Sequence, residues 1–116
     1  MAAQATARFI RMSPRKVRLV ANQIRGRSVN DAYAILQFSK KAAARPFGKT
    51  LRSAVANAQQ KGEGQGEAVD VDELVIREVY VNEGPTLRRF RAGAQGRPSP
   101  RRHRMSHITV VVDTRE

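Results

Sequence analysis

Residues 84–105 carry seven arginines and no acidic residue, and they connect two segments rich in β-branched residues. These two segments, 69–82 and 107–113, have the composition and alternation typical of β-strands. A connection of this length is uncommon within a small domain and is usually functional. Because a strand anchors each end, it cannot be a free tail. We expect it to pair with itself as a hairpin with about ten residues in each arm, reaching roughly 30 Å beyond the body.

The first half of the chain contains the start signals of two helices. Ser13-Pro14 places a hydroxyl N-cap before a proline, and apolar residues follow at helical spacing until Gly26. A second helix is expected at 29–36, with Ser28 or Asn30 as its cap.

A third helix is expected at about 40–60, where Pro46 marks either a kink or the true start. A strand is expected at 4–11, and a glycine-rich polar loop at 61–68. The predicted fold is therefore α+β: three helices packed on a three-stranded antiparallel sheet, with a long extended β-hairpin protruding. A length of 116 residues suits a single domain, 1–116, that includes the hairpin at 84–105.

The charge pattern points to a polyanionic partner. The formal net charge is +12, and arginine greatly outnumbers lysine. Residues 1–60 and 84–116 are basic, whereas 61–83 holds seven acids against two basic groups. Arginine matches phosphates and stacks on bases, so this bias favours nucleic acid over an acidic membrane. We expect no membrane association and no export. The absence of cysteine fits a reducing, cytoplasmic compartment.

The sequence offers no scaffold for catalysis, so we expect a protein that is not an enzyme and has no cofactor or metal. Gly62, Gly64 and Gly66 follow a helix and precede acids, whereas a phosphate-binding loop follows a strand and precedes a helix. His103 and His107, four residues apart on an extended chain, would lie roughly 13 Å apart, too far to share a metal.

Two further features favour binding of RNA. Arg15 and Lys16 occupy a first helical turn, where the helix dipole disfavours cations unless a phosphate is bound there. Phe90 lies among arginines, as suits stacking on an unpaired base. The alternatives are an ordinary solvated basic helix face and a merely flexible basic loop. The cations at 40–52 fit an RNA-binding face and an ordinary solvated helix surface equally well.

Several motifs together resemble one family. Ser13-Pro14-Arg15-Lys16-Val17-Arg18 with Ile24-Arg25-Gly26, Ser53-Ala54-Val55-Ala56-Asn57-Ala58, and Glu83-Gly84-Pro85 with Ser106-His107-Ile108-Thr109-Val110 resemble, in order, bacterial large-subunit ribosomal protein twenty-two. The resemblance implies a structural constituent of the large ribosomal subunit that binds the large (23S-type) ribosomal RNA and supports assembly. It also implies that the hairpin lines the peptide exit tunnel.

The resemblance and the charge pattern together assign the site residues. The implied partners are large-subunit ribosomal RNA, neighbouring ribosomal proteins and the nascent peptide, with no homo-oligomer. The expected RNA-binding residues are Arg11, Ser13, Arg15, Lys16, Arg18, Arg25, Arg27, Arg88, Arg89, Phe90, Arg91, Arg97, Arg101, Arg102, Arg104 and His107. The expected tunnel-lining residues are Leu87, Arg88, Arg89, Ala92, Gly93, Ala94, Gln95 and Gly96. The alternative function is a nonspecific nucleic-acid chaperone or DNA-binding protein, which would bind DNA and unrelated RNA equally well.

Overall fold

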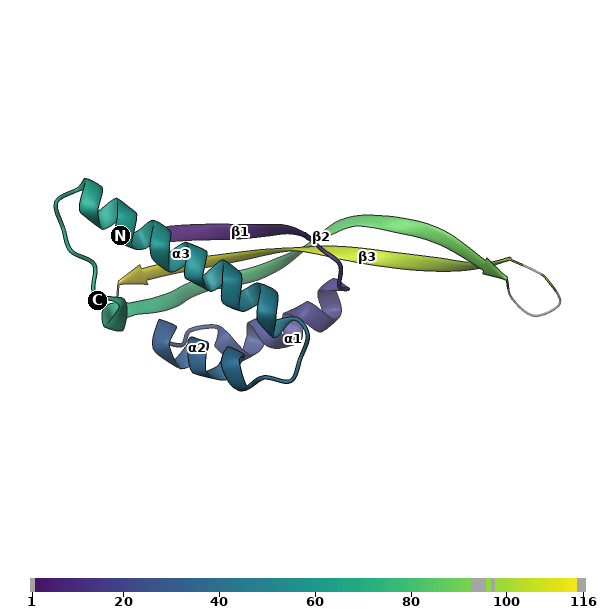
Figure 1. The fold of residues 1–116 in the computed structure, drawn as a ribbon, viewed down its shortest axis with the longest axis horizontal. Helices are drawn as coiled ribbons and strands as arrows, with labels where there is room; N and C mark the ends of the chain where they lie inside the picture. The colour runs from purple at the N-terminus through teal and green to yellow at the C-terminus, as the bar shows by residue number, and fades with distance from the viewer. Residues whose placement is uncertain (1, 93–95, 97, 115–116) are drawn as a thin grey trace.

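The computed structural model describes residues 2–92, 96 and 98–114. It describes the side chains of these residues except those of 88–92 and 98–102. It confirms the predicted α+β fold and its protruding hairpin (Figure 1). The elements are β1 (Ala3–Ile10), α1 (Pro14–Ile24), α2 (Val29–Phe38), α3 (Ala44–Gly64), a 3-10 turn (Val71–Glu73), β2 (Leu74–Ala92) and β3 (Pro98–Thr114).

The sheet is antiparallel with the order β1-β3-β2, so the C-terminal strand β3 lies in the centre. Helices α1 and α3 pack on one face of it, and α2 packs mainly against α3. The core between these layers contains side chains such as Phe47, Leu51, Ile76 and Val110, all nearly or fully buried. Beyond this core β2 and β3 continue as a ribbon, which gives the molecule a long axis of 67 Å (Figure 1).

The expected helix faces are confirmed, but only one of the expected hydroxyl caps is. Val17, Val20, Ala21 and Ile24 form the apolar stripe of α1, and all four are fully buried. Ser13 holds the N-cap position of α1, yet its side chain makes no cap hydrogen bond. Ser28, in contrast, accepts a hydrogen bond from the backbone N–H of Asp31 at 3.2 Å.

The boundary between α3 and β2 differs from the expectation. The helix continues into the loop expected at 61–68 and ends at Gly64, and Gly62 packs directly against the returning chain. A Cβ at Gly62 would lie 2.5 Å from Val69 Cγ2 and 2.6 Å from the Glu67 carbonyl oxygen. The strand expected from residue 69 begins only at Leu74, after a 3-10 turn at whose start the Asp70 side chain accepts from the Asp72 N–H.

The strand expected at 4–11 is confirmed as β1, but its side chains do not alternate regularly up to its end. Ala5 and Ala7 are partly buried on the core side, but Phe9 has a φ of 58° and is 59% exposed. The ladder to β3 shifts register between Ala7 and Ile10. A bulge of this kind changes which side chains face the core, and Ile10 packs against the core in place of Phe9.

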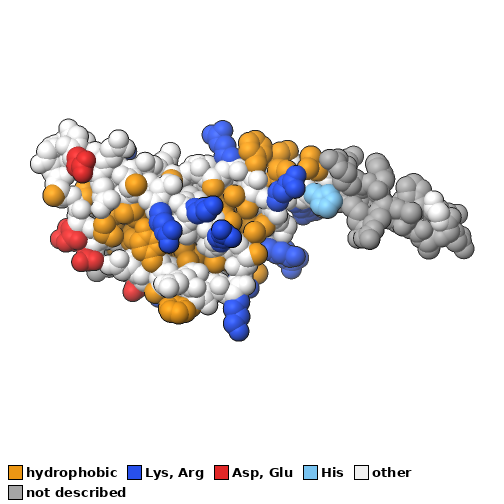
Figure 2. Space-filling view, in the orientation of Figure 1, with side chains coloured by type: hydrophobic (Ala, Val, Ile, Leu, Met, Phe, Trp, Pro, Cys, Tyr) orange, Lys and Arg blue, Asp and Glu red, His pale blue; other side chains and the backbone are white. Residues whose placement is uncertain are grey.

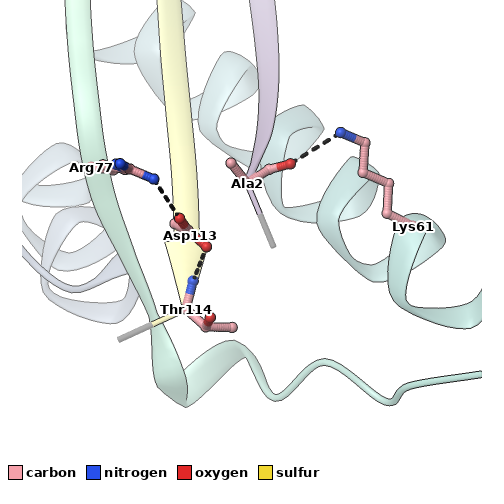
Figure 3. A network of polar contacts seen from close by, with 5 residues as sticks. All are labelled: Ala2, Lys61, Arg77, Asp113 and Thr114. Atoms are coloured by element: carbon pink, nitrogen blue, oxygen red, sulfur yellow. Dashed lines mark hydrogen bonds and ion pairs between the residues drawn. The ribbon is translucent and has the colours of Figure 1, made fainter. Parts of the chain in front are cut away.

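Polar contacts hold the end of the sheet that lies away from the hairpin. Lys61 Nζ donates to the Ala2 carbonyl at 3.0 Å, which ties the end of α3 to the start of β1 (Figure 3). Arg77 pairs with Asp113 at 2.8 Å between β2 and β3, and a carboxylate oxygen of Asp113 accepts from the Thr114 N–H (Figure 3).

Candidate nucleic-acid interface

The hairpin brings like charges into register. Beyond the body, β2 and β3 pair from Thr86 opposite Arg104 to Ala92 opposite Pro98. Within this ribbon Arg88 lies opposite Arg102, and Arg89 lies opposite Arg101. Like charges directly opposite each other destabilise an antiparallel pair. The two-stranded ribbon therefore gains stability from any anion that neutralises these positions. Arg97 and the tip positions Gly93, Ala94 and Gln95 lie outside the described residues.

A tight bulge marks the place where the hairpin leaves the body. The register of β2 against β3 shifts between Glu83 and Thr86, so Gly84 and Pro85 have no regular partners. Proline is tolerated at such a bulge because it has no N–H to donate. A Cβ at Gly84 would lie 3.2 Å from Met105 Cβ and from two ring atoms of His107. The root of the hairpin is therefore closely packed and sets the direction of the arm.

A groove opens beside this root. It is formed by the β1–α1 connection, the first turns of α1, the α2–α3 connection and the paired strands of the hairpin base. Its volume is about 1070 Å³. The lining residues are Arg11, Met12, Ser13, Lys16, Leu19, Lys41, Ala42, Ala43, Leu87, His103, Arg104 and Met105. The expected RNA-binding residues Arg11, Ser13, Lys16 and Arg104 thus meet in one place. We call this feature the root groove.

Two of the expected RNA-binding arginines are held by the protein itself. Arg18 Nη2 donates to the Val81 carbonyl at 3.0 Å, and Arg25 Nη2 donates to the Val79 carbonyl at 2.9 Å. Both carbonyls belong to β2, which is an edge strand of the sheet. Covering an edge in this way satisfies its free backbone groups and blocks further strand pairing. Part of the α1 face expected to be free for RNA therefore has a structural role.

Arg27 extends this cover along the same edge. Its backbone carbonyl accepts from the Ile76 N–H at 2.9 Å, while its side chain donates to the Gln23 carbonyl. In contrast, Arg11, Arg15 and Lys16 are exposed, and the described structure gives their side chains no hydrogen bond or ion pair. The first turn of α1 contains no acid. These three cations are the part of the face that remains available.

His107, another expected RNA-binding residue, also makes contacts within the protein. Its Nδ1 accepts the Phe9 N–H at 3.1 Å, and the two rings meet edge to face with centroids 5.1 Å apart. This bond requires the tautomer in which Nε2 carries the proton. His107 therefore holds the β1 bulge in place, and its availability to a ligand is limited to the other side of the ring.

On the face drawn in Figure 2 the charges of the body are separated along its length. On this face acidic side chains gather at the end opposite the hairpin, whereas Lys and Arg lie over the helices and around the hairpin root. Within the described residues no group of three His, Asp or Glu side chains is arranged to hold a metal. None of the helices described has the length and apolar character needed to cross a bilayer.

The sequence did not indicate most of the apolar residues of the root groove, although it placed Leu87 among the expected tunnel-lining residues. Met12, Leu19 and Met105 carry no charge pattern that would have marked them. A weak signal exists for Leu19, which is apolar but lies off the buried stripe of α1 and is 52% exposed. Lys41, for which the sequence left a binding and a solvated role equally open, lies at the groove.

Comparison with known proteins shows which family the chain resembles. The profile of the family "Ribosomal protein L22p/L17e" matches residues 5–113. The large ribosomal subunit protein uL22 of Desulfitobacterium hafniense is 54% identical over 110 residues, covering 95% of this chain and 92% of that protein. Its counterpart in Bifidobacterium longum is 50% identical over 116 residues, covering 100% and 98%. The counterpart in Pediococcus pentosaceus is 50% identical over 114 residues, covering 98% and 92%. The chain therefore belongs to the ribosomal protein L22p/L17e family.

Proposed function

We propose that this chain is a structural constituent of the large ribosomal subunit in the bacterial cytoplasm, where it binds the large ribosomal RNA, and that it is not an enzyme. The observation that carries the proposal is the hairpin register, in which arginine positions oppose arginine positions along a ribbon with no acid. Such an arm becomes stable when RNA phosphates surround it. Membership of a ribosomal protein family supports large-subunit ribosomal RNA as the partner.

The mechanism is scaffolding through phosphate contacts. The hairpin arginines neutralise the phosphates of RNA segments that would otherwise repel each other. These arginines are Arg88, Arg89, Arg91, Arg97, Arg101 and Arg102, and Phe90 lies among them in the sequence, where it suits stacking on an unpaired base. Arg11, Ser13, Arg15, Lys16 and Arg104 form a second contact around the hairpin root. Arg18, Arg25, Arg27 and His107 support this surface mainly by fixing the sheet edge and the β1 bulge. The whole chain, 1–116, works as one domain.

The hairpin is also proposed to line the peptide exit tunnel. Leu87, Arg88, Arg89, Ala92, Gly93, Ala94, Gln95 and Gly96 are the residues assigned to this role. The 67 Å long axis supports it, because β2 and β3 continue beyond the body as a ribbon as far as Ala92 and Pro98. The acidic end points away from the hairpin and suits contact with solvent or with neighbouring ribosomal proteins (Figure 2). The chain acts as a single copy that supports subunit assembly.

The test compares the full chain with a variant lacking 86–103. Binding to large-subunit ribosomal RNA, unrelated RNA and duplex DNA is measured across a salt series. The full chain should keep its preference for ribosomal RNA at high salt. The deletion should flatten the salt slope by roughly 0.7–0.9 for each phosphate that the shortened chain no longer neutralises. Equal binding to all three nucleic acids, with release at the same salt, would instead identify a nonspecific nucleic-acid chaperone or DNA-binding protein.

A further inference from the structure

We propose that the root groove receives an unstacked nucleobase of the bound RNA, so that the protein contacts a base there as well as phosphates. This inference rests on the proposed function for the identity of the RNA and goes beyond it in the mode of contact. Phosphate scaffolding alone needs only exposed cations. The root groove combines cations with an apolar surface, and that combination is what a base with its flanking phosphates requires.

The apolar part of the groove comes from five separate segments. Met12 lies before α1, Leu19 lies on α1, Leu87 lies on β2 and Met105 lies on β3, while Ala42 and Ala43 belong to the α2–α3 connection. Leu19 is 52% exposed and so adds open apolar surface to the groove. Methionine side chains are flexible and polarisable, and their sulfur makes favourable contacts with aromatic rings. Flat heteroaromatic bases are suited to such a surface.

The charged part of the groove has a single sign. Arg11, Lys16, Lys41 and Arg104 line it together with His103, and no Asp or Glu is among the lining residues. The described structure contains no ion pair for any of these four cations. A cleft lined by one sign of charge concentrates counter-ions and draws in a ligand of opposite charge. An RNA strand supplies that charge on both sides of the base it inserts.

Contacts within the protein hold the walls of the groove together. Ser106, which is fully buried on β3, donates from Oγ to the Met12 carbonyl at 2.7 Å and thereby fixes the β1–α1 connection against the hairpin base. Leu87 and His103 face each other across the ribbon as paired residues. A site whose walls are held in this way avoids much of the ordering cost of binding. Its volume of about 1070 Å³ exceeds what one base fills, which leaves room for the adjacent sugars and phosphates.

The experiment removes the apolar surface and keeps the charge. The test variant combines Leu19→Gln with Met105→Gln, both in the full chain. The matched control is Phe38→Gln, because Phe38 is an apolar helical residue that is 80% exposed and lies outside the groove. Base reactivity of large-subunit ribosomal RNA is mapped by chemical probing at equal protein occupancy. Affinity is measured in parallel, and circular dichroism verifies that each variant is folded.

The wild type and Phe38→Gln should protect the same small set of unpaired bases. The double variant should leave at least one of these bases reactive and bind about tenfold more weakly, as expected for the loss of one stacked base. Its salt slope should stay unchanged, because no cation is removed. Identical protection and affinity in the double variant would overturn the inference. So would unchanged protection together with loss of binding to a purified neighbouring ribosomal protein, which would assign the groove to a protein partner.

A second variant keeps the test independent of the double substitution. The chain contains no cysteine, so Leu19→Cys gives one attachment site for a photo-crosslinker, and Phe38→Cys gives the control. We expect the Leu19 position to crosslink to the base of an unpaired nucleotide and the Phe38 position not to do so. Crosslinks confined to paired RNA would contradict base insertion. Failure of the proposed function would appear differently, as equal binding of wild type to ribosomal and unrelated RNA.

Discussion

Phe9 and His107 are joined twice, by a hydrogen bond from the Phe9 N–H to His107 Nδ1 at 3.1 Å and by edge-to-face packing of their rings with centroids 5.1 Å apart. Phe9 has a left-handed backbone with a φ of 58°, a conformation that is costly for a bulky residue. His107 therefore compensates for the strain of the bulge. Because Ile10 reaches the core only through this bulge, the pair determines how β1 ends and where the chain enters α1.

His107→Ala should lower the free energy of unfolding by about 1 kcal/mol, because the variant lacks one hydrogen bond and one aromatic pair at a half-exposed site. Urea unfolding measures the change, and amide exchange at Phe9 should become faster. His103→Ala is the control, since His103 is exposed and the described structure gives it no hydrogen bond. An unchanged Phe9 exchange rate would show that the His107 ring does not hold the bulge.

The two serines at helix starts should respond differently to the same substitution. Ser28→Ala removes the acceptor of the Asp31 N–H and should cost about 1 kcal/mol of stability. Ser13→Ala removes no cap bond and should change stability by at most about 0.5 kcal/mol. Thermal unfolding of both variants checks this. Equal decreases in stability would mean that Ser13 caps α1 in solution.

Two glycines of α3 should give opposite results when replaced by alanine. Gly48→Ala meets nothing within 4 Å and should stabilise the protein by about 0.4–1 kcal/mol, because alanine restricts the unfolded chain. Gly62→Ala places a Cβ against Val69 and the Glu67 carbonyl and should destabilise by about 1–3 kcal/mol. Urea unfolding distinguishes them. A stabilising Gly62→Ala would indicate that the chain after α3 does not pack as described.

Gly84→Ala should loosen the root of the hairpin. Its Cβ would approach Met105 Cβ and the His107 ring at 3.2 Å, and the Met105 Cβ is fixed to the backbone. We expect stability to fall by about 1 kcal/mol, as for mild overpacking, and amide exchange in 86–92 to become faster. Thr86→Ala, at an exposed neighbouring position, is the control and should have little effect. Unchanged exchange in Gly84→Ala would show that the arm's direction is fixed elsewhere.

Two arginines of the same α1 face should separate stability from RNA binding. Arg25→Met keeps the aliphatic stem but removes the bond to the Val79 carbonyl, so it should cost about 1 kcal/mol of stability. Arg15→Met should leave stability nearly unchanged while lowering RNA affinity and reducing the salt slope by about 1. Urea unfolding and a salt series measure both effects. If Arg25→Met and Arg15→Met lowered the RNA affinity equally and left stability unchanged, Arg25 would be an RNA-binding residue and not a structural one.

The sequence alone determined the local elements and the position of the arginine-rich arm. The stripe of Val17, Val20, Ala21 and Ile24 specified the buried face of α1, because helical periodicity is set by backbone geometry within one segment. Two apolar strands flanking seven arginines likewise specified a hairpin. The charge pattern and the motifs then indicated RNA and the family, since neither depends on how distant segments meet.

Only the tertiary structure decided which side chains remain available. Arg18 and Arg25 share the exposed face of α1 with Arg15, and nothing in the spacing shows that β2 carbonyls engage the first two. The root groove likewise joins Met12 and Leu19 to Met105, which lies more than 80 positions further along the chain. This arrangement follows from strand register, the two bulges and the packing of α1 against an edge strand. Such long-range geometry has no periodicity in the sequence, so only the folded chain reveals it.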